Sequence, residues 1–158
     1  MIIDGALQFT GTPGVAGSAD TPTTGTQQST NVIDLVNARD MGIGDDPAIK
    51  LLCVVKTTFT GGTSIQVQFQ GAPDSGSGTP GTYTTYAESA AVLEADAIAG
   101  RYLLPIDVPR PPPGVANPRF LRLQYVTAGT HGAGAIFASL VLDRQDSPFY
   151  PAGITIPN

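Results

Sequence analysis

The chain has 158 residues, a formal net charge of −5 and only 13% charged residues, which suits one domain around a single core. Its eight basic residues are scattered, so it lacks the clustered Lys and Arg that nucleic-acid binding requires. No apolar stretch is long enough to span a membrane and the N-terminus has no signal-peptide pattern, so we expect a protein that is made in a cytoplasm and inserts into no membrane.

Residue usage favours strands joined by many turns. The chain contains 19 Gly and 14 Pro, with abundant Thr, and this mixture is typical of all-β proteins. Cys53, the only cysteine, lies in an apolar run, and we expect it to be a buried, unreactive thiol. One Cys and one His cannot build a disulfide framework or a zinc site, so the sequence predicts no metal and no cofactor.

The first half of the chain predicts four strands. Apolar residues favour strands at residues 1–9, 31–36 and 49–55, with a long polar loop at residues 11–28. Ile65, Val67 and Phe69 alternate with glutamines, which indicates a half-buried strand. The Gly61-Gly62 pair before it predicts a hairpin turn.

The second half predicts further short strands. They are expected at residues 83–86, 90–93, 101–106, 121–125 and 136–142, with a Gly-, Ser- and Pro-rich loop at residues 71–81. Residues 109–114 carry too many prolines to join a ladder and predict a stiff loop. The prediction is a single domain over residues 1–158, a β-sandwich or jelly roll of about eight short antiparallel strands with little helix. It carries a Pro-rich tail at residues 145–158.

Catalytic patterns are weak. His131 could act as a general base with Asp107 or Asp143 as its partner, but we favour an exposed histidine in a hairpin loop. No Gly-x-Ser-x-Gly elbow lies between a strand and a helix, so we expect no enzyme.

Two other groups of side chains have simpler explanations. Asp40, Asp45 and Asp46 could bind a hard cation, but their spacing is not that of an EF-hand and aspartate is common in turns. Asp34 and Arg39 could pair across this turn. A second group, Tyr83, Tyr86 and Tyr125, could form a sugar-stacking platform, although tyrosines more often line sandwich edges with the hydroxyl in water.

The best interface candidates lie outside the strand pattern. A stiff loop loses little entropy on docking, and an exposed apolar tail marks an interface unless it packs on its own domain. With the charged turn after the second strand, the candidate contact residues are Arg39, Asp40, Pro111, Pro112, Pro113, Phe149, Tyr150, Ile154 and Ile156.

Several segments, in order, resemble the capsid cement (decoration) proteins of tailed bacteriophages, as found on a Bordetella phage head. They are Ile3-Asp4 with residues 7–10, then residues 29–44, 103–105, 119–125 and 140–143. The resemblance covers most of residues 2–145 and rests on the order and spacing of these segments. The loops at residues 11–28, 71–81 and 108–118 are longer than in that family.

The resemblance implies a jelly-roll protein on the outer surface of the virion, made in the bacterial host. Its expected partners are the major capsid protein and further copies of itself, as a homodimer or alternatively a trimer. The alternative hypothesis is a glycan- or receptor-binding β-sandwich of a phage particle.

Overall fold

The structure is a computed structural model that describes residues 4–15, 18–38 and 48–142. Within these ranges the regular elements are strands and two short 3-10 turns, which confirms the all-β class. The turns are η1 (Gly5–Leu7) and η2 (Glu94–Asp96). The strands are β1 (Thr24–Gln28), β2 (Ile33–Asp34), β3 (Lys50–Ala72), β4 (Thr84–Glu88), β5 (Val92–Leu93) and β6 (Phe120–Val141).

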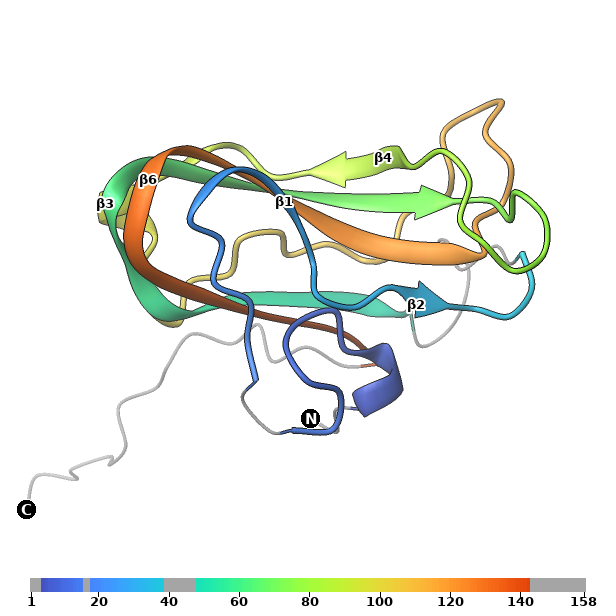
Figure 1. Cartoon of the computed structure of the whole chain (residues 1–158), viewed down its shortest axis with the longest axis horizontal. Helices are drawn as coiled ribbons and strands as arrows, with labels where there is room; N and C mark the ends of the chain where they lie inside the picture. Colours follow the sequence, from blue (N-terminus) through green and yellow to red (C-terminus); the bar gives the residue numbers. More distant parts are fainter. Residues whose placement is uncertain (1–3, 16–17, 39–47, 143–158) are drawn as a thin grey trace, which may run out of the picture.

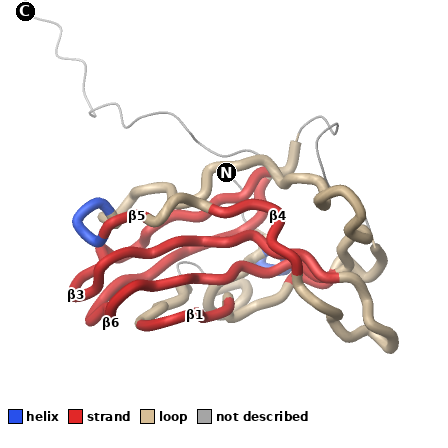
Figure 2. Tube along the Cα trace, turned by 90° about the horizontal axis from the view of Figure 1, so that it is seen from above, coloured by secondary structure: helices blue, strands red, loops and turns tan. Residues whose placement is uncertain are grey.

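The strands form one antiparallel sheet that folds over on itself. Its order is β1-β6-β3-β4, with β2 also on β6 and β5 also on β3, and Figure 2 shows β1, β6, β3 and β4 side by side. In Figure 1, β3 and β6 curve round together at one end of the molecule, so that the two halves of the sheet face each other. A sandwich therefore results from two long, bent strands.

This corrects the prediction of about eight short strands. The runs at residues 49–55 and 65–69 belong to one strand of 23 residues, β3, and those at 121–125 and 136–142 to one strand of 22 residues, β6. The hairpin predicted at Gly61-Gly62 is wrong. Four register shifts lie between Val55 and Ser64, and such bulges bend a strand without reversing it.

Glycines make the bend possible. Gly61 and Gly129 have φ angles of 85° and 75°, values that residues with a side chain rarely adopt. A Cβ at Gly62 would lie 2.2 Å from the His131 ring, so only glycine leaves room for that ring. The bend is thus encoded by a few residues whose role depends on contacts distant in sequence.

Shorter segments also differ from the sequence prediction. Residues 4–9, the described part of the first predicted strand, contain the turn η1, which Asp4 caps, and a single bridge between Gln8 and Ser139. Residues 101–106 form no regular strand, but they run along β3: Tyr102 bridges to Val54, and backbone hydrogen bonds join Arg101, Leu103 and Ile106 to β3. The polar loop predicted at residues 11–28 contains β1, an edge strand with mostly exposed side chains, which explains why it carries no alternating apolar pattern.

The core lies between the two halves of the sheet. Phe9, which donates its amide to Ala138 of one half, meets Phe69 of the other half edge to face at 6.1 Å. Cys53 is fully buried as predicted, and burial raises the pKa of its thiol to about 12. Within the described residues, no helix is both long and apolar enough to cross a bilayer.

Candidate interaction surfaces

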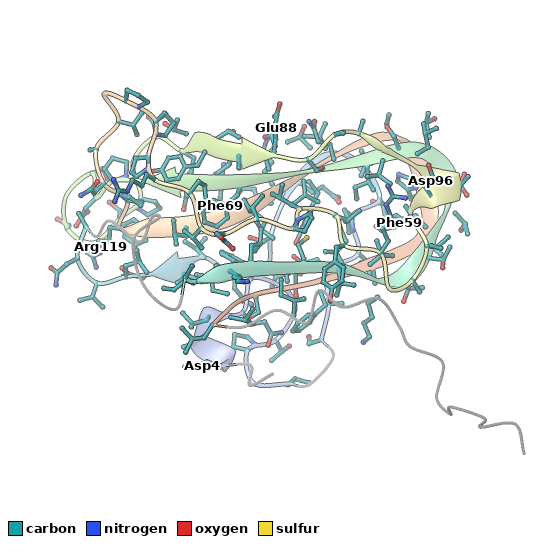
Figure 3. All side chains as sticks on the ribbon, turned by 180° about the vertical axis from the view of Figure 1, so that it is seen from behind. Asp4, Phe59, Phe69, Glu88, Asp96 and Arg119 are labelled. Atoms are coloured by element: carbon teal, nitrogen blue, oxygen red, sulfur yellow. The ribbon has the colours of Figure 1, made fainter. Side chains whose placement is uncertain are left out.

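Arg119 joins three segments at the end of the sandwich remote from the bend. Its Nε and Nη2 donate to the two carboxylate oxygens of Asp34 at 2.9 and 3.0 Å, and its Nη1 donates to Asp74 Oδ2 at 2.6 Å. Figure 3 shows Arg119 at one end of the molecule and Phe59 and Asp96 at the other. We call these three side chains, Asp34, Asp74 and Arg119, the arginine clamp.

Hydrogen bonds in and around the clamp lower the pKa values of its two aspartates. Hydrogen bonds from Arg119 and from the Val36 amide lower the pKa of Asp34. The pKa of Asp74 is also lowered, first by the Gly76 amide and then by Arg119. In return the two carboxylates raise the pKa of Arg119. Because all three side chains are partly exposed, solvent weakens each pair, and the clamp acts mainly by fixing geometry.

Asp34 has a partner that the sequence did not suggest. It pairs with Arg119, 85 residues away, because the pairing of β2 with the start of β6 brings these two side chains together. The sequence suggested Arg39 as a partner across the following turn. Arg39 itself lies outside the described residues.

The proline loop lies at the same end of the molecule. In Figure 1 it is the yellow-orange loop that rises at the upper right, before β6. As predicted, Pro111, Pro112 and Pro113 join no strand; the first two are half-buried and the third is exposed. The Val115 amide donates to the Pro112 carbonyl at 3.0 Å and Gly114 has a φ of 84°, so the loop closes in a tight turn.

The remaining predicted contact residues lie outside the described ranges: Arg39, Asp40, Phe149, Tyr150, Ile154 and Ile156. The same holds for Asp45 and Asp46 of the candidate cation turn. Among the described residues, no group of three or more His, Cys, Asp or Glu side chains forms a metal centre. The structure therefore places only the proline loop among the predicted contacts.

Sequence reasoning missed a buried carboxylate beside β1. Asp20 is 7% exposed, and its Oδ1 accepts from the Gly11 amide and the Thr30 hydroxyl. Its Oδ2 accepts from the Thr30 amide and the Tyr125 hydroxyl, each at 3.0 Å. An aspartate in a Thr- and Pro-rich segment resembles any turn residue, so the sequence offered no signal.

Asp20 and Tyr125 also line a groove of about 540 Å³, together with Ala19, Thr21, Pro22, Thr26, Gln27, Gln28 and Thr30. The carboxylate already accepts four hydrogen bonds, which occupy its acceptor positions. We therefore interpret Asp20 as a structural latch that holds the N-terminal loop against the sheet.

The three tyrosines do not share an exposed face. Tyr125 is 1% exposed, and burial raises the pKa of its hydroxyl well above the usual value. Arg122 lies 3.6 Å from the centre of the Tyr83 ring, and Tyr86 packs against Phe69. The hydroxyls of Tyr83 and Tyr86 are buried without a partner. The stacking platform and the picture of hydroxyls in water are thus both incorrect.

His131 is likewise not the exposed loop residue predicted. It lies in β6, is 2% exposed and meets Phe59 edge to face at 5.0 Å. Its Nε2 lies 3.3 Å from the Ser64 carbonyl oxygen and its Nδ1 has no partner. The bend covers the ring, which explains why a His flanked by glycines is buried.

Outside the core, side-chain amides form a network over one face of β6, β3 and β4. Gln124 donates to Gln68 at 3.2 Å, and Gln68 donates to Glu88 at 3.0 Å. Arg122 donates to Gln70 at 2.9 Å. These glutamines are the polar side of the alternation read in the sequence, and they satisfy one another across the strands.

The sequence pattern of the Bbp16 family matches residues 18–140. The chain belongs to the Bbp16 family. The family name points to a protein of a Bordetella phage. No curated protein matches the chain.

The match to the Bbp16 family covers nearly all the strand residues of the sandwich. Residues 18–140 contain β1 to β5 and all but the last residue of β6. They also contain Asp20, the proline loop and the arginine clamp. The latch and the clamp therefore belong to the part of the chain that the family pattern describes.

Proposed function

We propose that this protein is a capsid cement protein, which binds the outer surface of a tailed-phage head. In this role it clamps neighbouring subunits of the major capsid protein and stabilises the mature shell. The observation that carries the proposal is membership of the Bbp16 family over residues 18–140, with a family name that points to a phage protein. The role requires no catalytic step.

The fold suits such a role. A ligand that binds only the assembled shell stabilises it by mass action, and many copies on a symmetric lattice add weak contacts through avidity. The sandwich provides a rigid body, and the arginine clamp holds loops at one end of it. A preorganised loop loses little entropy on binding, which favours the proline loop as a contact.

The protein's other partner in this proposal is a further copy of itself, as a homodimer or trimer, placed on the outside of the virion. Self-association would let one oligomer of this protein contact two capsid subunits at once. Analytical ultracentrifugation of the purified protein is expected to show a species larger than the monomer.

The test is co-sedimentation of the purified full chain with heads that lack it, followed by heating. Saturable binding and a higher temperature of head disruption are expected. Replacing Pro111, Pro112 and Pro113 by alanine should weaken binding, whereas Pro105→Ala, at an exposed proline outside the loop, should not. Deleting residues 147–158 should also reduce occupancy while leaving a folded domain. Protein that stays in the supernatant would show that the function is wrong.

A further inference from the structure

β1 leaves one edge of the sheet open. It comes first in the strand order β1-β6-β3-β4, and no other strand among the described residues pairs with its outer side; Figure 2 shows it at the border of the sheet. Directly after β1, the Ser29 amide donates to the Leu123 carbonyl of β6 at 2.9 Å. Because alternate residues of an antiparallel strand bond to the same neighbour, Thr26 and Gln28 turn their backbone N–H and C=O groups outwards.

This edge has neither the charges nor the prolines that commonly protect an edge strand. Its sequence is Thr-Gly-Thr-Gln-Gln, and its register shift lies between Thr24 and Gly25, so the last three residues pair regularly. β4, at the other edge of the sheet, ends in the charged Glu88. An open edge binds an extended segment of chain through backbone hydrogen bonds. Since β1 has only five residues, the segment that fits it is short.

The groove lined by Asp20 and Tyr125 lies at this edge, since residues 26–28 of β1 also line it. Asp20 is the one charged residue of the lining, and four hydrogen bonds already occupy its carboxylate. Pro22 and Tyr125 supply apolar surface. The edge and the groove together therefore suit a short, uncharged and extended segment with apolar side chains on one side.

The end of the chain contains one segment of this kind. Residues 143–158 lie outside the described residues, and within them the run Gly153-Ile154-Thr155-Ile156 alternates β-branched apolar residues with threonine. This pattern is typical of a strand and puts both isoleucines on one side. The run is uncharged, and Pro151 and Pro157 bound it. Its length and its chemistry match the open edge.

We propose that residues 153–156 of one copy add as a strand to the open edge of β1 in a second copy, with both isoleucines facing the groove. This inference rests on the self-association in the proposed function and names its interface. The connecting residues 143–152 include Pro148 and Pro151, and prolines stiffen a linker, which disfavours a return to the same domain. When extended, this connection spans up to about 35 Å. In a closed pair, each tail fills the groove of the other copy.

The test measures self-association of the full chain by analytical ultracentrifugation. Wild type is expected to form a species larger than the monomer. Replacing Ile154 and Ile156 together by aspartate puts charge on the added segment, and Thr26→Pro removes an amide that faces away from β6. Each change is expected to weaken association about tenfold or more. Thr26→Ala keeps the amide and is the matched control, with association like that of wild type.

Mixing the two variants tests whether the exchange takes place between copies. The Thr26→Pro chain has an intact tail, and the isoleucine variant has an intact edge. An equal mixture should therefore regain one of the two connections and associate more strongly than either variant alone. The isoleucine variant alters no described residue, so its result still decides the proposal if Thr26→Pro does not fold.

The outcomes separate the two proposals. Unchanged association of the isoleucine variant overturns the exchange, as does wild type that is monomeric at every concentration. Loss of association in the isoleucine variant but not in Thr26→Pro overturns the β1 edge and assigns the tail to another surface. Wild type that associates and does not bind heads overturns the proposed function and leaves the exchange standing.

Discussion

Tyr125 donates its hydroxyl to the carboxylate of Asp20 at 3.0 Å, across 105 residues of sequence. Tyr125 pairs with Val67 in one half of the folded sheet, whereas Asp20 exchanges backbone hydrogen bonds with Ile136 in the other half. The bond therefore connects the two halves along the side of β1. The Asp20 carboxylate is stable inside the molecule because it accepts four hydrogen bonds there.

Replacing either partner of this bond should have unequal effects. Tyr125→Phe leaves Asp20 with three donors, so the free energy of unfolding is expected to fall by about 1 to 2 kcal/mol. Asp20→Asn turns a donor group towards other donors and should cost about 2 to 4 kcal/mol. Urea denaturation measures both. Thr21→Ala, at an exposed neighbour, should change little, and an Asp20→Asn variant as stable as wild type would contradict the latch.

The bend predicts a contrast between two glycines. A Cβ at Gly62 would lie 2.2 Å from the His131 ring, whereas a Cβ at Gly132 would meet nothing closer than the Thr60 carbonyl at 3.9 Å. Gly62→Ala is expected to destabilise the protein by about 1 to 3 kcal/mol through overpacking. Gly132→Ala should have a smaller effect in the same thermal melts. Equal effects would mean that the ring does not need this space.

Acidic pH should weaken the arginine clamp. The folded protein lowers the pKa of Asp34 and Asp74, so their stabilising effect is complete above about pH 4, the usual aspartate value. It is lost as the pH falls through the lowered values. Calorimetric melting temperatures should decrease from about pH 5 to pH 2. Asp34→Asn should show a smaller decrease, and an identical profile would contradict the assignment.

Alkaline pH should act through Cys53. Since the folded protein raises the pKa of its thiol to about 12, the unfolded thiol ionises first, and the folded state loses stability as the pH rises above about 9. Tyr125 acts in the same direction, so Cys53→Ala should reduce the alkaline loss without abolishing it. A thiol reagent at pH 8 should label the unfolded chain much faster than the native protein.

The sequence predicted the parts of the fold that depend on local patterns. The alternation of Ile65, Val67 and Phe69 with glutamines placed one side in the core and the other in a polar network, and the structure agrees. The prolines at 111–113 lie in a loop because they cannot donate to a ladder. The family resemblance was likewise carried by linear order and spacing.

Two predictions failed where local patterns have more than one solution. A Gly-Gly pair between two strands is compatible with a hairpin or with a bulged bend, and only the pairing of β3 with β6 over nearly its whole length selects the bend. The sequence also predicted His131 in a loop, because glycines flank it. Its burial follows from the neighbouring Gly62 and Phe59 on β3, which the linear sequence does not bring together.

The sequence by itself determined the all-β class, the buried thiol and the likeness to a Bordetella phage protein, because side-chain alternation, turn residues and motif order are properties of neighbouring positions. Only the tertiary structure decided that two long strands fold into the sandwich. It also decided that Asp20 latches the N-terminal loop and that Arg119 pairs with Asp34 and Asp74. These features depend on residues that are distant in the chain and meet only after the sheet has folded over.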